Sequence, residues 1–231
     1  MQETFKPNIP VKPDLVIFDL DGTLYDTPKL RKLLMRKLLF RLFSFRFHLK
    51  DFVIIKTFRE EREKKKGYSS GRLNDEQFEW CASRMNLPVN RVRKCIEDYM
   101  YHFPLPFLKR LKYKGIDEFF TLLRKKQIKI AIFSDYPVEE KLQVLGLSSD
   151  AMYFSTQPFI GQLKPNPKAL QFICSDMKTK PENTLYIGDR EDTDGEGARK
   201  AGISFICVDR KKAAKGTFYS DLYKQLQTYH D

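Results

Sequence analysis

Two aspartates, Asp19 and Asp21, stand one residue apart at the end of an apolar run, in the stretch LVIFDLDGTL at residues 15–24. Four apolar residues followed by acids are typical of a buried parallel strand with carboxylates at its carboxyl end, the edge where open α/β sheets carry out chemistry. A turn at Gly22 would swing Asp21 aside, so that one carboxylate can attack while the other handles a proton. Two carboxylates this close repel each other unless a cation lies between them or one keeps its proton. The stretch therefore predicts a site that binds a divalent metal.

Later segments also place polar residues where a strand or loop ends. Ser134 and Asp135 follow one apolar run, Lys164 lies in a predicted loop, and Asp189 follows another apolar run. We expect strands at 14–19, 129–133, 152–154, 185–187 and 204–208, and helices at 116–126, 138–145, 167–177 and 195–201. This alternation predicts an α/β fold with a Rossmann-like, doubly wound parallel sheet and right-handed crossovers.

The segment 27–111 shows helical patterns and no strand pattern. A long pattern with leucines nearly every fourth residue begins at Thr27 or Pro28, with a break expected around 47–50. Two shorter helices follow, at 74–85 with Asn74 or Asp75 as the cap and at 90–101 with Asn90 as the cap. We therefore predict an all-α domain at 27–111, inserted into a core made of residues 1–26 and 112–231.

The composition is that of a soluble globular protein, with 42% hydrophobic and 31% charged residues among 231. No apolar run approaches the ~20 residues of a membrane-spanning helix, and residues 1–7 lack a signal-peptide core. We expect a cytoplasmic protein whose four separated cysteines are reduced. The three histidines are isolated, which gives little support to a histidine metal site or a catalytic triad.

The net charge of +12 is concentrated in one segment, because residues 29–66 hold 14 Lys and Arg against 4 Asp and Glu, a net +10. Three interpretations stay open for this basic, Leu- and Phe-rich segment. It is a cap helix that packs its own apolar face, a positive lid that attracts substrate, or an interfacial helix that binds an anionic membrane or nucleic acid. We favour the first and do not expect a nucleic-acid partner, while peripheral membrane contact through this segment remains an alternative.

Four short segments together resemble, in order and approximate spacing, the four motifs of the haloacid dehalogenase superfamily of phosphohydrolases. They are DLDGT at 19–23, FS at 133–134, GQLKPNP at 161–167, and GD at 188–189 with the acids up to Asp194. The resemblance covers about 14–26 and 112–209. The helical insertion is similar to the C1-type cap of phosphoglycolate phosphatase-like members, with hinges at Asp26 and 112–115.

This resemblance implies roles for the acidic residues. Asp19 would attack phosphorus to form an aspartyl-phosphate, and Asp21 would protonate the leaving oxygen and then activate water. Mg²⁺ would be held by the Asp19 carboxylate, the Asp21 backbone carbonyl and Asp189. Asp194 would lie in or near the shell around these ligands, with Asp192 a weaker candidate for that position.

The resemblance also implies a set of substrate-binding residues. Thr23, Ser134, Asp135 and Lys164 would contact the transferring phosphoryl group, whose charge the Lys164 ammonium would help to stabilise. Asp135 stands where relatives often carry asparagine, which puts its substrate contact in doubt.

We therefore expect a Mg²⁺-dependent phosphomonoester hydrolase that acts on a small phosphorylated metabolite. Asp21 favours a phosphatase over a dehalogenase, because cleavage of a carbon–halogen bond does not need that acid. Two alternatives stay open: a phosphotransferase like the related sugar phosphate mutases, and a basic membrane- or nucleic-acid-binding module on a phosphatase scaffold.

Overall fold

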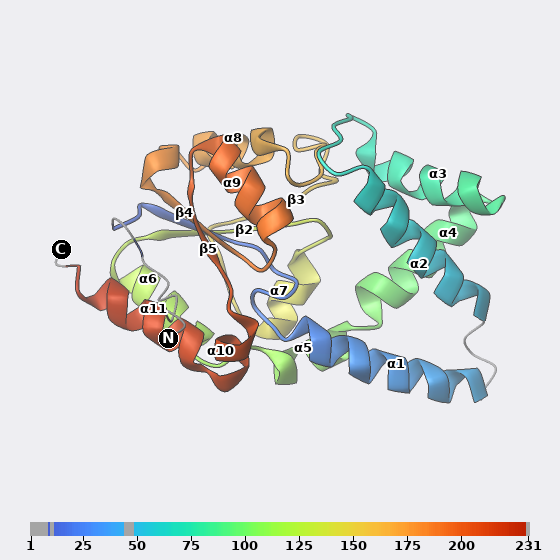
Figure 1. Cartoon of the computed structure of the whole chain (residues 1–231), viewed down its shortest axis with the longest axis horizontal. Coiled ribbons are helices and arrows are strands. Elements are labelled where there is room, and N and C mark those ends of the chain that lie inside the picture. Colours follow the sequence, from blue (N-terminus) through green and yellow to red (C-terminus); the bar gives the residue numbers. More distant parts are fainter. Residues whose placement is uncertain (1–8, 10–11, 44–48, 230–231) are drawn as a thin grey trace, which may run out of the picture.

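The computed structural model describes residues 9, 12–43 and 49–229. Its centre is a parallel sheet of strand order β3-β2-β1-β4-β5 (Figure 1). The strands are β1 (Leu15–Phe18), β2 (Lys129–Ser134), β3 (Ala151–Phe154), β4 (Thr184–Gly188) and β5 (Ser204–Cys207). Leu15 lies opposite Lys129 on one side and Thr184 on the other, so β1 is the middle strand. Every residue of β1 is buried, as expected for a strand covered on both faces.

One face of the sheet is covered by helices from three parts of the chain. These are α6 (Ile116–Lys125), α7 (Glu139–Leu145), and α11 (Thr217–Gln227) near the carboxyl end, which follows the short α10 (Arg210–Lys215). Phe18 packs against Phe119 and Phe120 with ring centroids 6.2 and 4.8 Å apart. Phe119 also contacts Tyr219 of α11, which joins α6 and α11 in one hydrophobic cluster.

The other face is covered by α8 (Pro167–Asp176) and α9 (Glu196–Ala201) (Figure 1). A second hydrophobic cluster there joins Ile17 and Phe133 of the sheet to Leu170 and Ile173 of α8. Helices on both faces make the sheet doubly wound, so the predicted Rossmann-like α/β fold is confirmed.

The inserted segment is helical, and none of its described residues between 27 and 111 forms a strand. Its elements are α1 (Thr27–Phe43), α2 (Leu49–Lys64), α3 (Leu73–Met85), α4 (Val89–Ile96), the π-helical turn η1 (Glu97–His102), α5 (Leu105–Leu108) and the 3₁₀ turn η2 (Lys109–Leu111). Phe58 of α2 stacks on Phe78 of α3 in a separate hydrophobic cluster that also includes Ile96. The helical cap predicted from the sequence is therefore present.

The predicted helix caps are wrong. Helix α3 begins at the buried Leu73 and α4 begins at Val89 after Pro88, and neither start has a side-chain cap hydrogen bond. Packing of Leu73 fixes the first turn of α3, and Pro88 with φ −61° precedes the first turn of α4. Most of the predicted break at 47–50 lies outside the described residues, and α2 starts at Leu49.

The two ends of the insertion lie side by side. Tyr25 and Lys112 form an antiparallel bridge, and Leu30 and Leu108 belong to the hydrophobic cluster on the α6 face of the sheet. The first turn of α1 and the end of α5 therefore pack together on the core. The domain boundaries after residues 26 and 111 stay a prediction. No helix in the described part of the chain is long and apolar enough to cross a membrane.

A second junction joins the loop after α2 to the loop that carries Lys164. Three backbone hydrogen bonds connect them: from Ser70 N to Gly161 O (2.9 Å), from Leu163 N to Tyr68 O (2.9 Å) and from Gly67 N to Lys164 O (3.1 Å). Gly161 has φ +55°, and a Cβ there would lie 2.6 Å from the Ser70 carbonyl oxygen. Only glycine permits this close approach of the two backbones.

Candidate active site

Asp19 lies immediately after β1, at the carboxyl edge of the sheet. Its backbone N–H donates to Ile187 O (2.9 Å) of the neighbouring strand, which fixes where the side chain leaves the sheet. Thr23 Oγ1 donates to Asp19 Oδ2 (2.9 Å), and Lys164 Nζ lies 2.8 Å from Oδ1. Thr23 therefore contacts Asp19, the predicted nucleophile, and is not among the residues that line the cavity. A direct contact between Thr23 and substrate stays a prediction.

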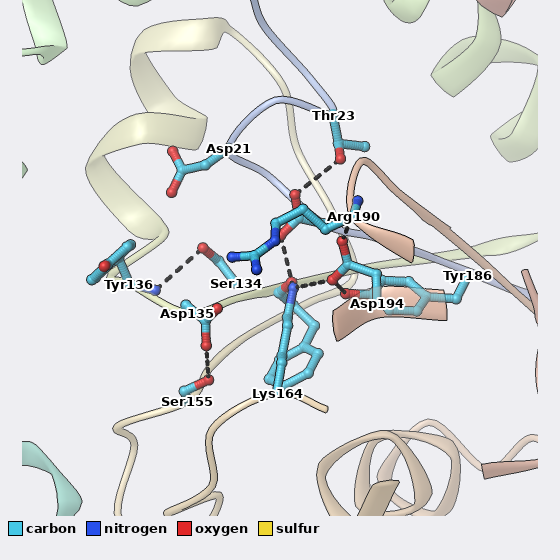
Figure 2. Close-up of polar contacts among 12 residues, drawn as sticks. Asp21, Thr23, Ser134, Asp135, Tyr136, Ser155, Lys164, Tyr186, Arg190 and Asp194 are labelled. Atoms are coloured by element: carbon cyan, nitrogen blue, oxygen red, sulfur yellow. Dashed lines mark hydrogen bonds and ion pairs between the residues drawn. The ribbon is translucent and has the colours of Figure 1, made fainter. Parts of the chain in front are cut away.

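Lys164 is the cation at the centre of the site, with only 5% of its surface exposed. Its ammonium group donates to Asp19 Oδ1 (2.8 Å), Asp194 Oδ1 (2.8 Å) and the Phe133 carbonyl oxygen (3.1 Å), and Figure 2 shows it reaching up to Asp194. Burial by itself lowers the pKa of Lys164, but the charges of Asp19 and Asp194 more than reverse this and raise it. Lys164 is therefore charged and held rigidly by three acceptors.

Three carboxylates gather around this lysine. Oxygens of Asp19, Asp189 and Asp194 all lie within 4.8 Å of one another. Gly22, with φ +101°, makes room for them, because a Cβ there would lie 2.1 Å from Asp189 Oδ2. Burial raises the pKa of Asp19 well above its ordinary value; the Lys164 charge opposes this, and the charges of Asp194 and Asp189 add to it. The site therefore holds more negative charge than its lysine neutralises.

Asp189 and Asp194 are oriented by their own partners. Arg210 lies 2.6 Å from Asp189 Oδ2, but burial still raises the pKa of Asp189. Asp194 accepts hydrogen bonds from Tyr186 OH (2.7 Å) and from the Arg190 backbone N–H (3.1 Å). These fixed, buried oxygen donors have the chemistry that a divalent cation such as Mg²⁺ requires. Asp194, and not Asp192, contacts Lys164.

The Asp21 side chain points away from this cluster (Figure 2). Both of its carboxylate oxygens lie 2.8 Å from Lys141 Nζ, and Tyr25 OH donates a further hydrogen bond. Burial alone would raise the pKa of Asp21, but the Lys141 charge and these hydrogen bonds lower it. Sequence reasoning missed Lys141 and Tyr25, because one is an ordinary helical lysine and the other an ordinary aromatic residue by pattern.

Ser134 is the last residue of β2 and Asp135 follows it. In Figure 2 both lie on the side of the Lys164 ammonium group that faces away from Asp194. The Tyr136 backbone N–H donates to Ser134 Oγ (3.3 Å), and Ser155 Oγ donates to Asp135 Oδ1 (2.8 Å). Arg62, a buried residue of α2, donates to the Asp135 carbonyl oxygen (2.9 Å) and lies 3.5 Å from Oδ1. Asp135 thus joins the core to the cap, and its predicted contact with substrate stays a prediction.

These residues surround a cavity of about 630 Å³ between the core and the cap. Asp19, Asp21, Ser134, Asp135, Lys164, Asp189 and Asp194 line its core side, and α1 and α2 supply Arg31, Arg59 and Arg62 on its cap side. A buried carboxylate, a fixed ammonium group and a cluster of carboxylate oxygens of the kind that hold a divalent cation face one cavity. This arrangement suits the transfer of a phosphoryl group, where positioning and neutralisation of charge are the main requirements.

Comparisons with known proteins agree with this chemistry. A sequence profile of the family described as "Haloacid dehalogenase-like hydrolase" matches residues 16–208. The "Glyceraldehyde 3-phosphate phosphatase" of Methanopyrus kandleri is 28% identical over 200 residues, which cover 85% of this chain and 84% of that protein. The protein of the same name from Pyrococcus furiosus is 24% identical over 220 residues, which cover 94% of this chain and 87% of that protein.

Solved structures share the fold. The magnesium-bound HAD-hydrolase YfnB of Bacillus subtilis superposes with a TM-score of 0.64 at 16% identity, covering 94% of this chain and 100% of that chain. The β-phosphoglucomutase of Clostridium difficile superposes with a TM-score of 0.59 at 18% identity, covering 94% of this chain and 98% of that chain. At these identities the two structures establish the common fold, including a helical cap, and nothing about substrate.

Proposed function

Because this chain belongs to the haloacid dehalogenase-like hydrolase family and is a phosphatase, we propose that it hydrolyses the phosphomonoester of a small sugar phosphate through an aspartyl-phosphate on Asp19. The observation that carries this proposal is the buried Asp19 carboxylate, 2.8 Å from the Lys164 ammonium at the wall of the cavity between core and cap. The names of the curated relatives support a sugar phosphate as the substrate class.

In the first half of the reaction, an Asp19 oxygen attacks phosphorus and the bond from phosphorus to the leaving oxygen breaks. Asp21 takes up a proton from solvent as it turns away from Lys141 and donates this proton to that oxygen, which leaves as an alcohol. In the second half, Asp21 accepts a proton from water as the water oxygen attacks phosphorus, which releases inorganic phosphate and frees Asp19. Since Lys141 and Tyr25 hold Asp21 in the structure, we infer that Asp21 turns towards the substrate when the cavity fills.

Lys164 and a divalent cation would share the neutralisation of charge. We propose that Mg²⁺ is bound by the Asp19 and Asp189 carboxylates and the Asp21 backbone carbonyl, with Asp194 beside them. The fit rests on the three carboxylates whose oxygens lie within 4.8 Å of one another. When bound, the cation supplies positive charge to the phosphoryl oxygens. Lys164, fixed by Asp194 and Phe133 O, stays in place as a second positive charge when Asp19 is phosphorylated.

Asp19→Asn tests the nucleophile. An amide is a poor nucleophile, so we expect phosphate release from a panel of sugar phosphates in Mg²⁺ to be lost, as it should also be for the unaltered enzyme in EDTA. Asp117→Asn is a matched control, because that exposed carboxylate lies on α6 and pairs with Lys112 outside the cavity. Near-normal release by Asp19→Asn would refute the mechanism. Product analysis with a hexose phosphate separates hydrolysis from the mutase alternative, in which the phosphoryl group reappears on sugar.

A further inference from the structure

The basic side chains that line the cavity differ in whether a carboxylate group pairs with them. Eight Lys and Arg side chains from the described residues line it. Six have a nitrogen 2.6 to 3.5 Å from a carboxylate oxygen: Arg62, Lys66, Lys141, Lys164, Arg190 and Arg210. The other two are Arg31 and Arg59, and neither has a carboxylate within ion-pair distance among the described residues. Glu60, next to Arg59, instead pairs with Arg84 at 2.9 Å.

Arg31 and Arg59 line the same cavity although they come from different helices. Arg31 lies near the start of α1 and Arg59 lies in α2. Burial lowers the pKa of Arg31, the charges of Arg59 and Arg210 lower it further, and those of Asp189 and Asp21 oppose them. Two like charges held together repel each other, and an anion between them would remove that cost. Arginine also suits this task, because its planar guanidinium group binds carboxylate or phosphate through two parallel hydrogen bonds.

The position of the pair within the cavity limits which part of a substrate it can reach. Asp19 and Lys164 line the core side, where the phosphoryl group must lie for attack, and both arginines come from the cap. The cap side of the cavity is therefore left for the leaving group of the phosphomonoester.

We propose that Arg31 and Arg59 form a subsite for a second anionic group, a carboxylate or a phosphate, on the leaving group of the substrate. This inference rests on the proposed function, since it assumes that the phosphoryl group is transferred to Asp19. It narrows the substrate class from sugar phosphates in general to those that carry a second negative group away from the phosphate to be hydrolysed.

Two pairs of substrates with the same carbon skeleton test the subsite. Glycerol 3-phosphate and 3-phosphoglycerate differ by a carboxylate, and fructose 6-phosphate and fructose 1,6-bisphosphate differ by a phosphate. For the unaltered enzyme we expect that, in at least one pair, kcat/KM for the substrate with the second anionic group exceeds that for its partner by about tenfold or more. The pair that shows the preference identifies the anionic group. Equal kcat/KM within both pairs would overturn the subsite while leaving the phosphatase activity established.

The double variant Arg31→Gln with Arg59→Gln should lower that preference at least about tenfold, mainly through KM. Lys32→Gln with Lys56→Gln is the matched control, since it removes the same charge from α1 and α2 at residues outside the cavity lining, and it should leave the preference unchanged. If the double arginine variant lowers kcat/KM equally for both members of a pair, the arginines do not recognise the second anion, and the proposal is refuted. Phosphate release from none of the four substrates would refute the proposed function and the subsite with it.

Discussion

Replacing Lys164 with methionine would remove the only ammonium group that contacts both Asp19 and Asp194 among the described residues. The change removes the ammonium donor, at 2.8, 2.8 and 3.1 Å, from two buried carboxylates and the Phe133 carbonyl oxygen, and leaves the carboxylates only the neutral donors Thr23 and Tyr186 and a backbone N–H. Removing one partner of a buried ion pair typically costs ~3–5 kcal/mol, because the remaining charge is left uncompensated. We expect Lys164→Met to lower the free energy of unfolding by about that amount in EDTA at about pH 8.

The pH dependence separates this cause from a simple packing defect. Asp19 already has a raised pKa, and removing the lysine raises it further, so the carboxylate takes up a proton as the pH falls. A protonated carboxyl group needs no cation, so the loss should shrink at about pH 5. Adding Mg²⁺ at about pH 8 should recover part of the loss.

Urea unfolding followed by circular dichroism measures these differences. Lys200→Met is the control, because its partner Glu196 is 2.6 Å away on the exposed surface and the pair should contribute less than ~1 kcal/mol. A loss below ~1 kcal/mol for Lys164→Met at about pH 8, or an equal loss at both pH values, would refute the reasoning.

Three further predictions follow from the same geometry. Lys141→Met should move the limb of the pH dependence of kcat/KM that is due to Asp21 to higher pH, because Lys141 lowers the pKa of Asp21 in the free enzyme; restoration by Lys141→Arg is the control. Mg²⁺ should raise the melting temperature more at about pH 8 than at about pH 5.5, because the raised pKa values of Asp19 and Asp189 let protons compete with the metal at low pH; equal gains would contradict this. At about 0.15 M salt the protein should not sediment with anionic vesicles, because Leu30, Ile54 and Phe58 of the basic segment are buried within the protein, although Leu49, Phe52 and Val53 are exposed; sedimentation would favour the interfacial interpretation.

The alternation of strands and helices could be predicted because each strand contains a short apolar run, and the runs in β1, β2 and β4 lead directly or within two residues to Asp19, Ser134 and Asp189. The parallel sheet then brings Asp19, Ser134 and Asp189 to one edge, whatever the details of the loops. Lys164 could be assigned only through its resemblance to a motif, since a lysine before a proline usually lies in solvent.

The cap side of the site could not be predicted in the same way. The excess of basic residues at 29–66 was visible, but helical periodicity does not say which of them turn towards the core. Arg62 is buried against Asp135, whereas Arg31 and Arg59 line the cavity without a described carboxylate partner. Lys141 was missed for a related reason, because its partner Asp21 is 120 residues away in the chain.

The backbone junction between the loops around Ser70 and Gly161 ties the cap to the core at a second place, apart from the hinges expected at Asp26 and 112–115. Lifting the cap at that side would strip three pairs of peptide groups of their partners, whereas a tilt about the junction would keep them. One of those bonds ends on the carbonyl oxygen of Lys164 itself. The junction therefore connects the loop after α2 directly to the peptide of Lys164, whose side chain contacts Asp19, so a shift of that loop would also act on the position of Lys164.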